Sequence, residues 1–172
     1  MNYGFGPASE DEKIVFGAQR PGYPLQSVQR HTIEEWISFM KNQGIKRVCC
    51  LLSEDQLDSY EGNLLEIYRE EFGYGNVCWA PMEDFHLCNP VTLKKKILPF
   101  LKDSDAKGEK VVVHCAAGIG RTGHILAAWL VFGRKFPVEE AFSAIRKMGR
   151  NPLEAVECGN ATLEDVHNLL VQ

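Results

Sequence analysis

The segment Lys110-Val-Val-Val-His114 continues directly into Cys115-Ala-Ala-Gly-Ile-Gly-Arg-Thr-Gly123, and an apolar run follows. Three consecutive valines between polar residues predict a strand buried on both faces, which is typical of a mostly parallel sheet covered by helices. The small residues after it predict a loop, and the apolar run predicts a helix. A strand, a loop of small residues and a helix N-terminus form an anion-binding arrangement, because loop N–H groups and the helix dipole point at the same place.

The rest of the chain alternates between strand-like and helix-like patterns. We therefore expect an α/β fold with a central, mostly parallel sheet of about four to five strands flanked by helices. The pattern predicts capping boxes at Thr32 with Glu35 and at Thr162 with Asp165, and a bend or break near Pro99. Strands are expected at 14–18, 45–52, 76–80 and 110–114, and helices at 32–43, 57–72, 90–102, 122–133, 138–148 and 162–170.

The 172 residues match the size of one domain, and 45% hydrophobic with 24% charged residues is typical of a soluble globular protein. We expect a single phosphate-binding domain over residues 1–172, with residues 1–12 as a flexible lead-in. The net charge of -4 argues against binding nucleic acid or an anionic membrane through bulk electrostatics.

No segment has the pattern of a secretory signal or of a membrane span, so we expect a cytoplasmic protein. We also expect a monomer.

Cys115 stands at the first position of the predicted loop, where the features that hold an anion also stabilise a thiolate. Loop N–H groups, the positive end of the following helix and the Arg121 guanidinium all favour negative charge on its sulfur, so the sequence predicts a nucleophile. Arg121 presents a planar fork that binds two phosphate oxygens at once, which lysine does not do equivalently. Thr122 is in reach to donate its hydroxyl to the sulfur. The alternative is a buried, unreactive thiol, which is typical of an isolated cysteine.

The loop contains a cysteine, five further residues, and then an arginine and a threonine. His114 precedes the cysteine, and Gly118 is at the third loop position. This pattern resembles the signature of the protein tyrosine and dual-specificity phosphatase superfamily. A Walker loop is excluded because the Gly-Lys-[Ser/Thr] ending is missing. The resemblance implies a two-step reaction without a cofactor or metal, in which Cys115 takes the phosphoryl group and water then releases it. It further implies that Thr122 assists the departing thiolate, that His114 supports the loop, and that the phosphate is bound by the backbone of Ala116, Ala117, Gly118, Ile119, Gly120 and Arg121.

A leaving alkoxide or phenolate needs a proton, so a carboxylic acid must face the phosphate from another loop. The family places an aspartate about 30 residues before the nucleophile, acting as this general acid. Asp84 fits that position here, in a loop that follows the strand expected at 76–80. Glu83 is an alternative candidate for the general acid. A second alternative is that both carboxylates only keep the loop solvated and have no catalytic role. His86 in the same loop is expected to be incidental.

The resemblance is to the small dual-specificity type, because the tryptophan-bearing acid loop and the tyrosine platform of the longer tyrosine-specific enzymes are missing. It implies a substrate that is a phosphorylated protein or peptide, carrying phosphotyrosine and also phosphoserine or phosphothreonine. The loop lacks Lys or Arg between Ala116 and Gly120, which argues against highly phosphorylated substrates. Two alternatives stay open: a phospho-binding scaffold module without turnover, and the same chemistry on a phosphoinositide, an inositol phosphate or the 5′ end of RNA.

Several residues outside the loop have two interpretations each. The segment that contains Arg146, Arg150, Asn151 and Pro152 resembles an arginine-rich turn that lies beside the phosphate loop in small dual-specificity enzymes. The alternative is that these charges are simply solvated. The glutamine that often follows this turn and positions the hydrolytic water is missing, so Asn160 replaces it or nothing does. Arg20 belongs to the active-site rim or to a structural turn. The cysteines other than Cys115 are expected to be buried thiols, with a protective disulfide from Cys88, Cys49 or Cys50 as the alternative.

Overall fold

The computed structural model describes residues 2–171 of the chain. Its five-stranded sheet has the order β1-β2-β5-β3-β4, and β1 is antiparallel to β2 while the other neighbouring strands are parallel. This confirms the expected α/β fold with a mostly parallel central sheet. The strands are β1 Gly6–Pro7, β2 Val15–Ala18, β3 Ile45–Cys50, β4 Val77–Trp79 and β5 Lys110–His114.

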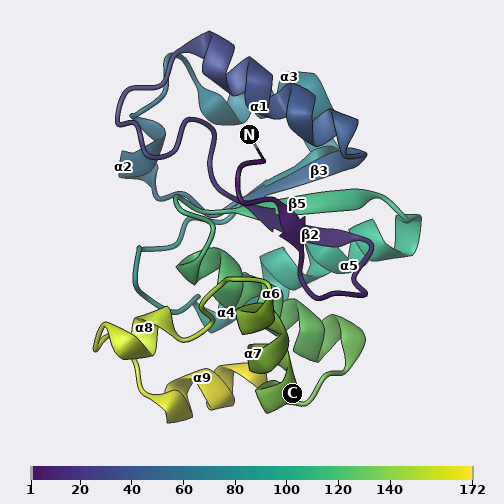
Figure 1. The fold of residues 1–172 in the computed structure, drawn as a ribbon, viewed down its shortest axis with the longest axis vertical. Helices are drawn as coiled ribbons and strands as arrows, with labels where there is room; N and C mark the ends of the chain where they lie inside the picture. The colour runs from purple at the N-terminus through teal and green to yellow at the C-terminus, as the bar shows by residue number, and fades with distance from the viewer. Residues whose placement is uncertain (1, 172) are drawn as a thin grey trace.

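Helices cover both faces of the sheet, with α1 and α3 on one face and α5, α6 and α7 on the other (Figure 1). Cys49 and Cys50 of β3 contribute to different core clusters, as expected for neighbouring residues of a strand. The helices are α1 Arg30–Asn42, α2 Glu54–Leu57, α3 Leu64–Phe72, the 3₁₀ turn η1 Tyr74–Asn76, α4 Pro90–Thr92, the π-helical turn η2 Leu93–Ile97, α5 Leu98–Lys107, α6 Gly120–Arg134, α7 Val138–Lys147, α8 Glu154–Glu157 and α9 Leu163–Leu170.

Two predicted helix starts are wrong. The helix α1 begins at Arg30 after Gln29, so Thr32 lies inside its first turn and caps nothing. The helix predicted over 57–72 begins only at Leu64, because the Asn63 side chain accepts a hydrogen bond from the Glu66 N–H and caps α3 there. The predicted capping box of the last helix is confirmed, since the Thr162 and Asp165 side chains each accept from the other residue's backbone N–H.

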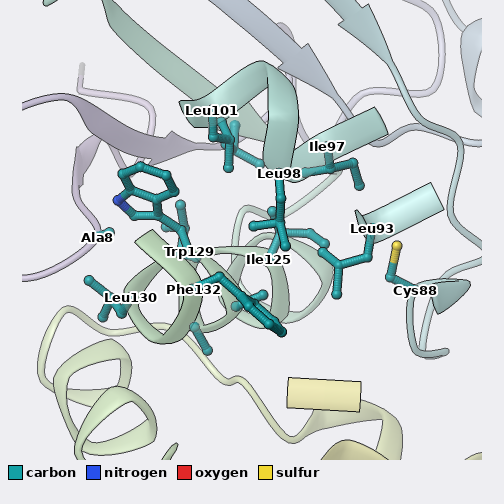
Figure 2. Close-up of a cluster of buried hydrophobic side chains, with 14 of the residues drawn as sticks. Ala8, Cys88, Leu93, Ile97, Leu98, Leu101, Ile125, Trp129, Leu130 and Phe132 are labelled. Atoms are coloured by element: carbon teal, nitrogen blue, oxygen red, sulfur yellow. The ribbon is translucent and has the colours of Figure 1, made fainter. Parts of the chain in front are cut away.

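The helix after Asn89 does not break near Pro99. Proline lacks an N–H group and its ring clashes with the carbonyl four residues earlier. The preceding turn η2 is π-helical, and the Leu98 N–H donates to the Leu93 carbonyl five residues back. This wider turn lets the chain continue into α5 as far as Lys107. Figure 2 shows the result, with Leu93 and Ile97 of η2 and Leu98 and Leu101 of α5 packed against Ile125 and Phe132 of α6.

Residues 6–12 belong to the packed fold rather than to a flexible lead-in. The edge strand β1 pairs with β2, and the Glu12 carboxylate is buried where the following segment enters β2. Glu12 accepts hydrogen bonds from the Val15 N–H, from the Trp129 indole and from the Arg134 guanidinium, at 2.9–3.1 Å. These partners hold the pKa of Glu12 below its usual range even though burial alone raises it. A buried carboxylate with this many donors ties the N-terminal segment to α6.

In the part of the chain that the structure describes, no helix has the length and apolar character needed to cross a membrane.

Candidate active site

The loop from Cys115 to Ile119 joins the central strand β5 to the N-terminus of α6. Figure 1 shows α2 and α8 at the same edge of the molecule, next to the loops that follow the strands. Gly118 has a φ of 76°, and a Cβ atom there would lie 2.6 Å from the Ala18 carbonyl oxygen. Only glycine allows this close approach of the loop to β2. The strand, loop and helix start predicted from the sequence are therefore present, with α6 beginning at Gly120.

Cys115 lies at the bottom of this loop and is 3% exposed. The Thr122 hydroxyl donates to its sulfur across 3.1 Å. A hydroxyl donor at this distance stabilises negative charge on sulfur, which is the form that attacks phosphorus.

His114 is fully buried and points away from the nucleophile's sulfur. Its Nδ1 atom lies 3.0 Å from the Cys115 carbonyl oxygen, which only accepts, so Nδ1 carries the proton. Nε2 then accepts from the Tyr68 hydroxyl at 2.9 Å. Burial lowers the pKa of His114 to about 4, and the hydrogen bond to the Cys115 carbonyl opposes this only in part. His114 is thus a neutral support of the loop backbone at pH 7.

Arg121 is the first-turn residue of α6 whose side chain turns under the loop, and that side chain is 1% exposed. Its Nη1 donates to the Gln56 Oε1 atom at 2.8 Å and to the Met82 carbonyl at 3.0 Å. Among residues 2–171, no hydrogen-bond partner is present for Nε or Nη2. Nη2 does lie 3.3 Å from the Asp84 carboxylate, an anion that a bound phosphate can replace. A guanidinium held through Nη1, with Nε and Nη2 without hydrogen-bond partners, is suited to bind an anion.

Gln56 contacts Arg121, which the sequence did not predict. Its Oε1 atom accepts from the Ser53 N–H at 3.1 Å as well as from Arg121, so it joins α2 to the loop residue. The available signal was the Ser-x-x-Gln capping pattern of residues 53–56, which predicts a helix start but not a partner 65 residues away.

Asp84 is brought to the site, whereas Glu83 is not. The Asp84 Oδ2 atom lies 3.3 Å from the Arg121 Nη2 atom, and its side chain is 36% exposed. Glu83 is 79% exposed and lies 3.8 Å from the His86 Nδ1 atom instead. The Asn160 side chain donates to the Phe85 carbonyl at 3.0 Å, so Asn160 supports the backbone of this loop.

The interpretations left open for two arginines are resolved by their contacts. Arg150 is buried and donates to the Gly118 carbonyl at 2.5 Å and to the Gly17 carbonyl at 3.0 Å, so it holds the loop against β2. Arg20 is also buried and donates to carbonyl groups of its own turn at Pro21 and Leu25, which is the structural use.

Glu154 is a second residue whose place the sequence did not indicate. A Cβ atom on Gly120 would overlap its carboxylate, so this side chain packs directly on the N-terminus of α6. Burial first and then the nearby Asp84 carboxylate raise the pKa of Glu154, while Arg121 opposes them. The carboxylates of Asp84 and Glu154 therefore both lie near Arg121.

All six cysteines are free thiols in this structure, and only Cys158 is exposed. Burial raises the pKa of Cys50 and of Cys88 to about 12. These two behave as the inert buried thiols that the sequence analysis expected, and neither is bonded to Cys115 here.

Two buried neutral histidines predict a loss of stability in mild acid. Burial lowers the pKa of both His114 and His124 to about 4. The unfolded chain binds these protons near pH 6.5, so the stabilisation is complete above that pH and is lost as the pH falls towards 4. Each histidine is expected to cost about 2 kcal/mol of unfolding free energy between pH 7 and pH 5. Urea unfolding at both pH values measures this, and His124→Asn should roughly halve the difference. An unfolding free energy that does not change from pH 7 to pH 5 would contradict the prediction.

Solved structures share this fold. Tk-PTP in its active form is 22% identical, and the match covers 94% of this chain and 97% of that chain with a TM-score of 0.69. A kinase associated phosphatase is 19% identical over 91% of this chain and 83% of that chain, with a TM-score of 0.68. These likenesses show that the chain shares the fold of these two phosphatases.

Sequence relatives identify the family. Human dual specificity protein phosphatase 5 is 36% identical over 69 residues, which are 40% of this chain and 18% of the relative. Dual specificity protein phosphatase PHS1 of Arabidopsis thaliana is 29% identical over 113 residues, 64% of this chain and 11% of the relative. The chain thus spans less than a fifth of either relative. The model of the dual specificity phosphatase catalytic domain matches residues 29–157, and the chain belongs to that family.

Proposed function

We propose that this protein is a cysteine-dependent phosphatase that hydrolyses phosphate monoesters of proteins. The observation that carries the proposal is the set of groups around one loop: a buried sulfur with a hydroxyl donor, an arginine with free donors, and a carboxylate 3.3 Å from that arginine. Each group has a role in phosphoryl transfer, and they come from two segments of the chain, the loop with the start of α6 and the loop that carries Asp84. The family membership supports the same chemistry.

In the first step, the Cys115 thiolate attacks phosphorus and a P–S bond forms while the P–O bond of the ester breaks. The leaving oxygen takes a proton from the Asp84 carboxyl group. The other phosphate oxygens accept from the loop N–H groups and from the Arg121 guanidinium, which stabilise the charge of the transition state. A bound phosphate dianion replaces Asp84 as the partner of Arg121, which leaves the carboxyl group free to carry its proton.

In the second step, water attacks the phosphorus of the phosphocysteine and the P–S bond breaks. Asp84, now a carboxylate, takes the proton from the water, and inorganic phosphate is the product. The Thr122 hydroxyl, 3.1 Å from the sulfur, stabilises the thiolate that departs.

We propose phosphotyrosine, and also phosphoserine or phosphothreonine, as the substrate groups. The loop carries no cation between Ala116 and Gly120, and the carboxylates of Asp84 and Glu154 lie beside it. These charges favour a single phosphate over a polyphosphorylated ligand. PTPMT1, which has the same fold with a TM-score of 0.64, was solved in complex with PI(5)P. A panel of phosphopeptides, phosphoinositides and RNA with a 5′ phosphate, assayed by phosphate release, therefore tests the substrate class.

The role of Asp84 predicts a dependence on the leaving group. Asp84→Asn is expected to lower kcat for phenyl phosphate by roughly 100-fold, because phenolate departs slowly without a proton. The loss should be much smaller for para-nitrophenyl phosphate, whose leaving group needs little protonation. Glu83→Gln is the matched control, since it removes the neighbouring carboxylate that does not reach Arg121. Equal losses for both variants, or an unchanged rate with phenyl phosphate, would exclude Asp84 as the general acid.

A further inference from the structure

A second feature of the molecule is a groove of about 590 Å³ at the edge of the sheet, which we call the edge groove. Its floor is the edge strand β4. Arg69 and Tyr74 line it from the side of α3 and η1, and Lys95 and Lys96 line it from η2 on the other side. Figure 1 shows α3 and α5 on opposite faces of the sheet, and β4 is the last strand in the sheet order. The edge groove is separate from the phosphate loop, and none of the residues proposed for catalysis lines it.

The charge of the edge groove is opposite to that of the whole chain. Four cations and one carboxylate line it, in a protein with a net charge of -4. The carboxylate, Asp103, is already paired with Arg47 at 3.3 Å and with Lys107 at 3.0 Å. Lys95 and Lys96 are exposed, and within residues 2–171 neither has a carboxylate in ion-pair distance. This positive charge is therefore available to an anionic partner.

Arg47 gives the edge groove a fixed cation. Its side chain is 4% exposed, its Nη1 donates to the Phe100 carbonyl at 3.0 Å and to the Ser104 hydroxyl at 2.5 Å, and its guanidinium lies 3.8 Å from the Phe100 ring centroid. No partner is present for its Nε atom in the described residues. Arg47 therefore adds positive charge to the groove wall without being an exposed contact itself. The pKa of Cys78 on the groove floor is lowered, first by its hydrogen bond with Cys49 and then by the charges of Lys96 and Arg47.

The edge strand β4 also has backbone N–H and C=O groups that face away from the sheet. The Ala80 N–H donates to the Cys50 carbonyl, so the backbone groups at Ala80 face β3. Backbone groups of successive residues in a strand point to opposite sides, so those of Trp79 face away from β3 and towards the open edge. An open strand edge binds an extended chain as an added strand.

We propose that the edge groove binds an extended acidic segment of a partner protein, which pairs with β4 and places its carboxylates against Lys95 and Lys96. A protein segment fits both the unpaired backbone edge and the cations, whereas a lipid surface or a free anion uses only the charge. Asp84 follows the end of β4 by five residues, which span about 17 Å when extended. A partner bound to β4 therefore reaches the phosphate loop with a neighbouring part of the partner's own chain. The binding itself does not depend on catalytic turnover.

Fluorescence anisotropy with a labelled, unphosphorylated peptide of alternating glutamate and valine tests the proposal. The peptide is expected to bind, and Lys95→Glu with Lys96→Glu should raise its Kd at least tenfold. Lys94→Glu with Lys102→Glu is the matched control, because both lysines are exposed on the same helical segment but outside the edge groove, and it should change Kd less than twofold. A lysine–valine peptide should not bind. N-methylation of alternate residues of the acidic peptide should abolish binding by removing the strand hydrogen bonds.

Hydrolysis of para-nitrophenyl phosphate by the Lys95→Glu, Lys96→Glu variant should equal that of the wild type, which separates this proposal from the proposed catalysis. Failure of the acidic peptide to bind, or equal weakening by the two double variants, would overturn the proposal. Binding to phosphatidylserine vesicles that is lost in Lys95→Glu, Lys96→Glu, without peptide binding, would also overturn it and assign the charge to a membrane surface.

Discussion

Cys115→Ser is expected to reduce kcat for para-nitrophenyl phosphate by about 10,000-fold or more, because a serine hydroxyl is far less nucleophilic than a thiolate in the same loop. The Thr122 hydroxyl, which now donates to the sulfur at 3.1 Å, does not make serine a comparable nucleophile. The measurement is the initial rate of nitrophenolate release with EDTA present. The replacement keeps the size of the side chain at a position that is 3% exposed, so the fold and the affinity for inorganic phosphate should be retained.

Cys158→Ser is the control for this prediction, because Cys158 is exposed and lies outside the loop. Its activity should equal that of the wild type. Activity that survives Cys115→Ser would exclude the covalent mechanism. A wild-type protein that binds phosphate at the loop but releases no nitrophenolate would instead support the scaffold interpretation.

Arg121→Lys is expected to lower kcat/KM for the same substrate by roughly 1,000-fold, because lysine keeps the charge but not the fork of donors that stabilises the transition state. Nη1 now holds the guanidinium in place through Gln56 and the Met82 carbonyl, while Nε has no hydrogen-bond partner in the described residues and Nη2 faces only the Asp84 carboxylate at 3.3 Å. A lysine ammonium cannot make both sets of contacts from one nitrogen.

Arg146→Lys is the matched control, since Arg146 is an exposed arginine of α7 and is expected to leave kcat/KM unchanged. Thermal unfolding of both variants establishes that they are folded. An Arg121→Lys variant that keeps more than a tenth of the wild-type kcat/KM would contradict the role of the bidentate contact.

The sequence by itself predicted the features that depend on neighbouring residues. The three valines of β5, the small residues after Cys115 and the apolar helix follow one another within fifteen residues, so their order alone predicts the phosphate loop. The last helix begins at Thr162 as predicted, because the capping box is made by residues three apart. Hydrophobic periodicity and short-range hydrogen bonds carry this information.

The same local rules produced the errors where packing overrode them. The sequence predicted a cap at Thr32 because the residue pattern is correct, but α1 starts two residues earlier. It predicted a bend or break near Pro99, and the helix is not broken there, because a π-helical turn satisfies the backbone and lets Leu98 and Leu101 pack against α6. Propensity is a weak preference that core packing overrides.

Only the tertiary structure decided which distant residues meet at the phosphate loop. The resemblance favoured Asp84 over Glu83 as the general acid, but only the fold shows that the Asp84 Oδ2 atom lies 3.3 Å from the Arg121 Nη2 atom. Gln56 reaches Arg121 from α2, and Arg150 holds the Gly118 carbonyl from beyond α7. Contacts between residues so far apart have no period or spacing in the sequence, because they arise from the packing of helices on the two faces of the sheet. The chemistry of the loop is therefore local in the sequence, while the groups that hold and complete it are brought there by the fold.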